Sequence, residues 1–219
     1  MKLKKIASLM LAGVMAVSML AGCSGNTTDN GGVSSGDTTP SSSYTETVLK
    51  ATNAATQTKL SASTNDKLDK AVAWAAQMDR ATDLGTKQTL TNIDNSNWDI
   101  VKNAQKYMTG TGLQAYSPDT TWNFNASTWS NASFPSTYWT MYYVSATASD
   151  EYITNEVAEK LDNWAKKMEN KGEVVNNYTY DYTVSVSKAD CAGKDLASKN
   201  DDYVLVGVAV TTTRTENKY

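Results

Sequence analysis

Residues 178–187 read YTYDYTVSVS, in which larger apolar side chains alternate with polar ones at a period of two. This period predicts a β-strand with one buried face and one solvated face. The preceding residues, 150–172, follow a helical period, because five apolar side chains recur at spacings of four, four, three and four: Ile153, Val157, Leu161, Trp164 and Met168. That spacing predicts an amphipathic helix with Gly172 as its C-terminal cap.

Two further strands are predicted on either side of this pair. Residues 136–148, STYWTMYYVSATA, are rich in the aromatic and β-branched side chains that favour strands. Residues 203–213, YVLVGVAVTTT, place valines on one face and Leu205, Gly207 and Ala209 on the other, which is typical of an inner strand covered on both sides. The C-terminal half is therefore predicted to run strand, helix, strand, strand.

Two amphipathic helices are predicted nearer the N-terminus. They span residues 64–80 and 97–108, where apolar side chains recur at spacings of three and four. Together with the strand-helix-strand-strand unit, these N-terminal helices predict an α+β domain. We expect the helices to pack on one face of a mainly antiparallel sheet.

The first 22 residues have the layout of an export signal. Three lysines in MKLKK precede an uncharged, largely apolar run, residues 6–22, which is short for a membrane-spanning helix and has a basic flank on one side only. The run ends in Leu20-Ala21-Gly22-Cys23, which resembles the lipobox of bacterial prolipoproteins at all four positions. The resemblance implies a lipoprotein that is cleaved before Cys23, acylated on that cysteine and anchored in the cell membrane, facing outside the cytoplasm. Two acyl chains are sufficient for stable anchoring.

An ordinary secretory signal whose cleavage site abuts a cysteine is the alternative, and it predicts a soluble secreted protein. In either case, residues 24–45 are rich in Ser, Thr, Gly, Asn and Asp and cannot bury enough apolar surface to offset the entropy of ordering. The predicted organisation is a signal peptide at 1–22, a lipidated cysteine with a flexible tether at 23–45, and a single extracytoplasmic domain at 46–219.

Composition excludes several classes of function. Loss of three lysines with the signal peptide leaves 17 basic against 23 acidic residues, a formal charge of −6. An acidic exported domain is a poor candidate for binding nucleic acid or anionic lipid surfaces. The chain has no histidine, which removes Ser-His and Cys-His catalysis and His-ligated zinc. We expect no cofactor and no metal, and we expect Cys191 to be an inert thiol that is buried or partly buried.

The segment from 109 to 136 carries the candidate binding residues. It has weak periodicity and sets Tyr116, Trp122, Phe124 and Trp129 among small polar side chains. Aromatic faces beside amides and hydroxyls suit stacking on sugar rings or packing on peptide. The alternative is that these rings only pin a long loop onto the core.

The leading functional hypothesis is a non-enzymatic binding module for a glycan or a surface protein. One alternative is a carboxylate-dependent hydrolase of the cell envelope that uses acids such as Asp119 and Asp150, which requires two carboxylates roughly 5 to 9.5 Å apart. Another is a structural or assembly component of the envelope whose aromatic residues all belong to the core. The sequence leaves the three open.

Overall fold

The structure of the protein is a computed structural model, which describes residues 38–76, 87–93, 98–129, 133–191 and 203–218. Residues 35–219 form a compact unit by themselves. The predicted signal peptide, the lipobox with Cys23 and most of the predicted tether lie outside the described residues. Within the described part of the chain, no helix is long and apolar enough to cross a membrane.

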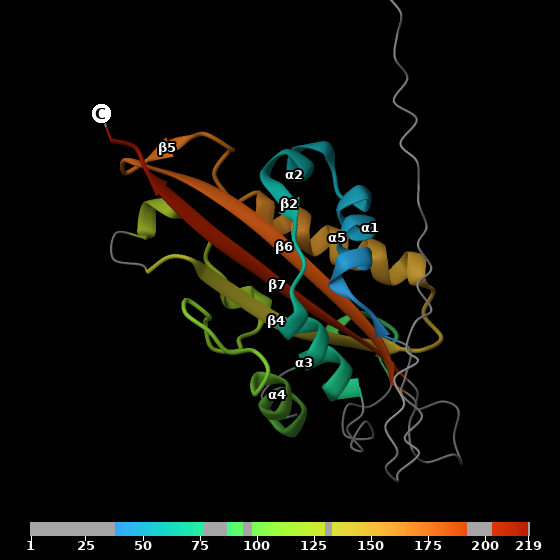
Figure 1. Ribbon diagram of the computed structural model, residues 1–219. Helices are drawn as coiled ribbons and strands as arrows, with labels where there is room; N and C mark the ends of the chain where they lie inside the picture. The colour runs from blue at the N-terminus through green and yellow to red at the C-terminus, as the bar shows by residue number, and fades with distance from the viewer. Residues whose placement is uncertain (1–37, 77–86, 94–97, 130–132, 192–202, 219) are drawn as a thin grey trace, which may run out of the picture. The chain divides into compact units, whose positions relative to one another are not determined.

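Three long antiparallel strands form the centre of the sheet: β4 (Ser136–Ser145), β6 (Tyr178–Cys191) and β7 (Tyr203–Glu216). The sheet order is β1-β6-β7-β4-β3, so β7, the last strand in the sequence, lies between the other two (Figure 1). Short strands lie at the two ends of this order, β1 (Thr38–Thr39) and β3 (Thr91–Asn92). The central position of β7 matches the prediction of an inner strand.

Several short segments in turn occupy the outer edge of β6. β5 (Val174–Val175) pairs with its start, β2 (Leu60–Ala62) runs parallel to its middle, and β1 pairs near its end. Between β2 and β1, the Thr45 hydroxyl accepts a hydrogen bond from the Val186 N–H at 2.8 Å. A side chain thus completes the ladder where no strand does, which keeps this edge from pairing with another chain.

Five α-helices are present among the described residues: α1 (Ser41–Ala51), α2 (Ala54–Lys59), α3 (Asp66–Ala76), α4 (Trp98–Gln105) and α5 (Asp150–Ala165). The start of α5 follows from its sequence, because the Ser149 hydroxyl accepts a hydrogen bond from the Tyr152 N–H at 3.1 Å. Asp150 and Glu151 follow in the first turn, where the helix dipole favours acidic groups.

Helices cover both faces of the sheet, so the prediction that they pack on one face is wrong. On one face, α1, α5 and the aromatic segment pack against the four valines of β7 at 204, 206, 208 and 210. On the other face, α3 and α4 pack against β4, Leu205 and Ala209. The α+β class and the mainly antiparallel sheet are confirmed. The partition of the helices between the two faces was not predicted.

Gly207 explains how α3 approaches the second face so closely. A Cβ atom at this position would lie 2.4 Å from the Val72 Cγ2 and 3.0 Å from the Leu68 Cδ1. Real carbon atoms do not approach each other to 2.4 Å, so the absent side chain provides the space that α3 occupies.

The boundaries of several elements differ from the prediction. β1 and α1 lie within residues 38–51, so ordered structure begins before the domain boundary predicted at residue 46. The Ser/Thr-rich sequence of α1 hides this helix, which buries mainly Tyr44, Thr45 and Val48. α5 ends at Ala165 rather than at Gly172, which instead has a φ of +81° in the following turn.

Candidate functional site

The predicted binding residue Trp122 is part of the core. Its side chain is 3% exposed, and its ring centre lies 4.5 Å from that of Trp164 and 5.6 Å from that of Tyr138. The indole N–H donates to the Ser117 hydroxyl at 3.2 Å. Both the faces and the polar group of this side chain therefore have partners within the domain.

The other three predicted binding residues are also packed inside the domain. Phe124 is fully buried, and Trp129 contacts Phe134 and Tyr180, each with ring centres 5.4 Å apart. Tyr116 packs edge-on against Trp139 with ring centres 5.0 Å apart, and it belongs to the cluster on the opposite face of the sheet.

The four aromatic candidates therefore do not come together in one site. Their burial corresponds to the alternative in which the aromatic residues pin the segment onto the core. A sugar would need an exposed ring face, and Trp129, the most exposed of the three in the first cluster, is only 9% exposed.

Asp119, one of the candidate acids, belongs to a cluster that fastens the aromatic segment to α5. It begins the short 3-10 helix Asp119–Thr121, and its Oδ2 accepts a hydrogen bond from the Tyr142 hydroxyl at 2.8 Å. The Lys160 Nζ lies 3.4 Å from the same oxygen and 4.7 Å from the centre of the Tyr142 ring. Burial, together with the Asp119 carboxylate, raises the pKa of Tyr142 well above its ordinary value, so this phenol remains a hydrogen-bond donor even at alkaline pH.

Asp150, the other candidate acid, belongs to a separate cluster. Its Oδ1 lies 2.6 Å from the Nζ of Lys188, which is 5.7 Å from the centre of the Tyr44 ring. Burial lowers the pKa of Lys188, but the hydrogen bond and charge of Asp150 outweigh this and leave it raised. Lys160 lies ten positions beyond Asp150 on α5, about 15 Å along the helix axis. Each carboxylate is paired with its own lysine, Asp119 with Lys160 and Asp150 with Lys188.

Cys191 is buried, as expected, at the end of β6. Its side chain is 3% exposed and lies beside Tyr203, whose pKa is raised by burial and by this thiol. Among the residues that the structure describes, no three Cys, Asp or Glu side chains are grouped so that they could hold a metal ion. The predicted lipidation site, Cys23, lies outside the described residues.

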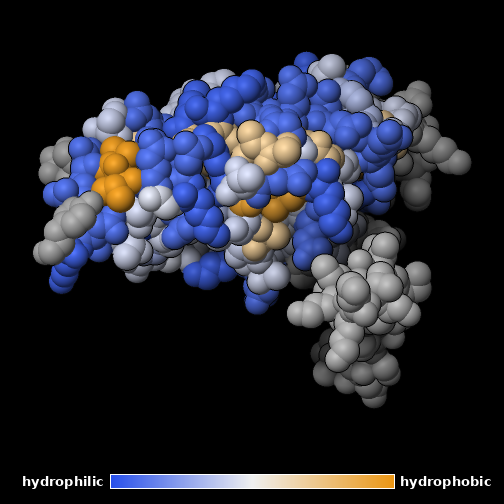
Figure 2. Space-filling view, turned by 90° about the horizontal axis from the view of Figure 1, so that it is seen from above, coloured by the Kyte–Doolittle hydropathy of each residue, from blue (hydrophilic) through white to orange (hydrophobic). Residues whose placement is uncertain are grey.

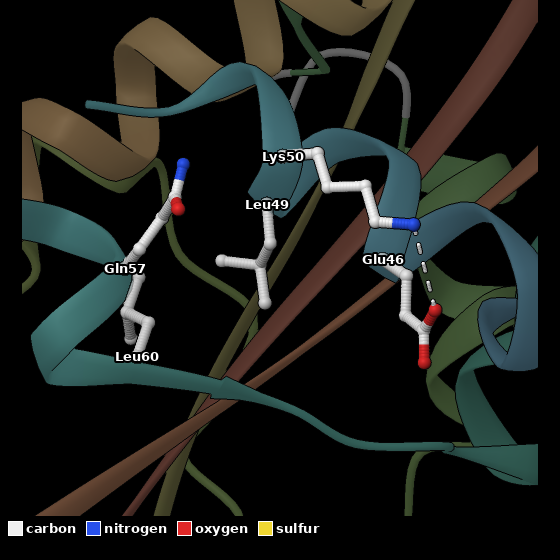
Figure 3. Close-up of a pocket in the computed structure, with 5 residues that line it drawn as sticks. All are labelled: Glu46, Leu49, Lys50, Gln57 and Leu60. Atoms are coloured by element: carbon white, nitrogen blue, oxygen red, sulfur yellow. Dashed lines mark ion pairs between the residues drawn. The ribbon is translucent and has the colours of Figure 1, made fainter. Parts of the chain in front are cut away.

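A small hollow between α1, α2 and β2 offers apolar surface to a ligand. It has a volume of about 200 Å³, and its lining residues are Glu46, Leu49, Lys50, Gln57 and Leu60. Figure 3 shows Leu49 pointing from α1 into the space beside Gln57 and Leu60, with the Glu46 and Lys50 side chains extending from the same helix. The surface view in Figure 2 shows hydrophobic patches surrounded by hydrophilic residues on this side of the molecule.

The charged residues at the rim of this hollow remain available to a ligand. The Lys50 and Glu46 side chains are 75% and 68% exposed and lie 4.0 Å apart, so their ion pair contributes little to stability. The hollow thus combines an apolar floor with one acid, one base and one amide at its edge.

A second hollow lies between α2 and α5. Polar groups that line it are hydrogen-bonded to other parts of the domain. The Asp162 carboxylate accepts from the Asn53 N–H at 3.2 Å, and the Lys59 amine donates to the carbonyl oxygens of Ala165 at 3.0 Å and Met168 at 2.6 Å. These bonds satisfy carbonyls at the C-terminal end of α5. The hollow beside α1 is therefore the better candidate site.

Sequence reasoning missed the hollow because its residues carry no motif. Leu49 is one of two adjacent apolar residues in a Ser/Thr-rich helix, and Leu60 stands alone between polar residues. A second missed feature is Trp74, which lies on the outer, lysine-bearing side of α3 and is 40% exposed. A tryptophan on the polar side of an amphipathic helix is the signal that could have identified it.

No protein-family model matches this chain, and comparisons with curated proteins and with solved structures give no significant match. The function is therefore inferred from the sequence and from the geometry of the domain.

Proposed function

We propose that this chain is a membrane-anchored lipoprotein facing outside the cytoplasm, whose domain is a non-enzymatic binding module for another surface protein. The anchor rests on the resemblance of Leu20-Ala21-Gly22-Cys23 to a lipobox after an export signal. The binding role rests on the hollow beside α1, which is the observation that carries the proposal.

The size of the hollow favours a protein side chain over a whole small molecule. Pockets for small ligands usually enclose about 300 to 1,000 Å³, whereas this hollow has about 200 Å³. An apolar side chain that inserts into a pocket with a polar rim is the usual anchor of a protein interface. Leu49 and Leu60 supply the apolar floor, and Glu46, Lys50 and Gln57 supply the rim.

A glycan is the less favoured ligand, because the aromatic residues that suited sugar stacking are buried. Trp122 and Phe124 have 3% and 0% of their surface exposed. Sugar recognition by stacking needs an accessible ring face, and these rings are covered by other side chains of the core.

Cell fractionation with metabolic palmitate labelling tests the anchor. We expect the full chain to fractionate with membranes and to incorporate label, while Cys23→Ser does neither; Ser24→Ala, at the next position, serves as the matched control. Equal membrane association of Cys23→Ser and the original chain, with no label in either, would contradict lipid anchoring.

Photo-crosslinking on intact cells tests the binding role. A photoreactive residue at the exposed position 57 should yield discrete protein adducts, whereas the same residue at exposed position 102 on α4 should not. Leu49→Asp should abolish the adducts, and Val174→Asp, the same kind of change at a 46% exposed residue of β5, should leave them intact. Identical adducts from positions 57 and 102, or none from either, would instead favour a structural role.

A further inference from the structure

The outer surface of α3 and α4 combines lysines with exposed aromatic rings. Trp74 of α3 is 40% exposed and packs against the half-buried Tyr107, which follows α4, with ring centres 5.9 Å apart. Four exposed lysines accompany these rings: Lys67, Lys70, Lys102 and Lys106. This set of six residues is called the α3–α4 face below.

Two lysines of α3 lie beside Trp74 on its solvent side, together with one exposed acid, Asp66, which is four residues before Lys70. At about 100° per residue, Lys67, Lys70 and Trp74 fall within about 60° of arc on the side of α3 away from the sheet. Asp69 lies on the flank near α1, where its carboxylate accepts hydrogen bonds from the Ser41 N–H at 2.8 Å and the Ser41 hydroxyl at 3.1 Å. This acid is therefore turned away from the lysine stripe.

The tether enters the domain beside α3. The described chain begins at Thr38, three residues before the Ser41 that bonds to Asp69 of α3. Fourteen residues, 24–37, separate Cys23 from Thr38, and a chain of this length spans at most about 55 Å when fully extended. A lipid on Cys23 would therefore limit the distance between Thr38 and the bilayer surface to about 55 Å, which allows the domain to reach that surface.

We propose that the α3–α4 face docks on the anionic phospholipid headgroups of the membrane that carries the anchor. This inference rests on the proposed lipidation of Cys23. Lysines attract anionic lipids, and tryptophan and tyrosine favour the level of the headgroups. The formal charge of −6 for the mature chain made anionic lipid surfaces an unfavoured partner on composition alone. Charges more than about 8 Å away are largely screened at physiological ionic strength, so the lysines nearest the headgroups decide docking.

Vesicle docking can be tested without relying on lipidation in cells. The chain from Cys23 onward is coupled through the Cys23 thiol to maleimide lipids, which leaves the buried Cys191 unmodified. The vesicles contain phosphatidylglycerol with phosphatidylcholine, or phosphatidylcholine alone, and both carry headgroup nitroxides that quench nearby tryptophan emission. Trp74→Phe identifies the contribution of Trp74.

We expect salt-sensitive quenching on the anionic vesicles, absence of quenching on the neutral ones, and loss of the effect in Trp74→Phe. The variant Lys70→Gln/Lys102→Gln/Lys106→Gln should lower the docking equilibrium constant by roughly two orders of magnitude, at about fivefold per lysine. Lys67 is left intact because its amine hydrogen-bonds to the Thr109 carbonyl oxygen. The matched control, Lys166→Gln/Lys167→Gln/Lys171→Gln, changes three exposed lysines elsewhere and should dock like the original chain.

Equal quenching on both vesicle types, no quenching on either, or equal losses in the two triple variants would each overturn the docking proposal. Failure of palmitate labelling in cells would instead overturn the anchor, because docking of the coupled protein is measured independently of cellular lipidation.

Discussion

The two faces of the central sheet are covered in different ways, although β7 contributes side chains to both. On the first face, the valines of β7 lie beneath α1, α5 and the large rings of the aromatic segment. On the second face, Leu205, Gly207 and Ala209 alternate with those valines, and α3 contributes Leu68, Val72 and two buried alanines. Large rings fill the layer beneath α5 on the first face, while Gly207 permits close contact of α3 on the second. The two faces should therefore respond to opposite kinds of substitution.

Removing a large ring from the first face should lower the free energy of unfolding more than any other change considered below. Trp122→Ala is expected to lower the free energy of unfolding by about 3 to 5 kcal/mol, because it deletes a buried ring that contacts Trp164 and Tyr138. Urea denaturation followed by circular dichroism measures this change. Trp74→Ala, at an exposed tryptophan on the second face, is the control and should cost less than about 1 kcal/mol. Similar small losses in both variants would contradict the packing role and return Trp122 to the candidate binding residues.

Adding a methyl group to the second face should have the next largest effect on the free energy of unfolding. Gly207→Ala is expected to cost about 1 to 3 kcal/mol, because the new Cβ would overlap the Val72 side chain. The double variant Gly207→Ala/Val72→Ala should recover part of this loss if the overlap is its cause, so that the two changes are not additive. Strictly additive losses in denaturation experiments would show that α3 does not approach the sheet this closely.

The attachment of α1 on the first face should depend on one hydroxyl. Thr45→Val keeps the shape of the side chain but leaves the buried Val186 N–H without its acceptor, at a cost of about 1 to 2 kcal/mol. Thr47→Val, at an exposed position of the same helix, is the matched control. Hydrogen exchange at Val186 would show faster exchange in Thr45→Val alone, and unchanged exchange would argue against this bond.

Ionisation of buried tyrosine hydroxyls should have the smallest effect on the stability of the domain, and only at alkaline pH. Burial raises the pKa of Tyr182 from 10.0 to about 12, so the folded state keeps this phenol protonated after the unfolded state begins to ionise. Its contribution is complete below pH 10 and is lost as the pH rises towards 12. The melting temperature should fall between pH 10 and 12, and less steeply in Tyr182→Phe. If the melting temperature of Tyr182→Phe falls as steeply as that of the original chain, the loss of stability comes from the ionisation of other tyrosines, such as Tyr203 on the second face.

Periodic segments were predictable because their patterns report burial directly. The predicted strands at residues 178–187 and 204–210 are confirmed as parts of β6 and β7. The prediction that one face of the first strand is solvated is wrong for its second half, because Ser185 and Ser187 are buried where α3 packs against β6. The helix starting at Asp150 is confirmed. α1 and α2 were not predicted, since their Ser/Thr-rich sequences have little intrinsic helical signal and are stabilised by packing against β6 and α5.

The candidate site was predicted less well than the fold. The aromatic segment could equally have formed a binding surface or a cover for the core, because composition does not say which way a ring faces. Burial of Trp122 and Phe124 is decided by α5 and β6, whose Trp164 and Tyr182 lie far along the chain. The hollow beside α1 depends likewise on the meeting of three short elements.

By itself, the sequence determined the α+β class, the order of the long strands and helices, and the motif from which lipid anchoring at Cys23 is proposed. These follow from local periodicity and from a short contiguous motif. Tertiary structure decided which helices cover each face, which aromatic residues are buried and which lysines share a surface with Trp74. Such properties depend on contacts between residues distant in sequence, and no local pattern encodes them.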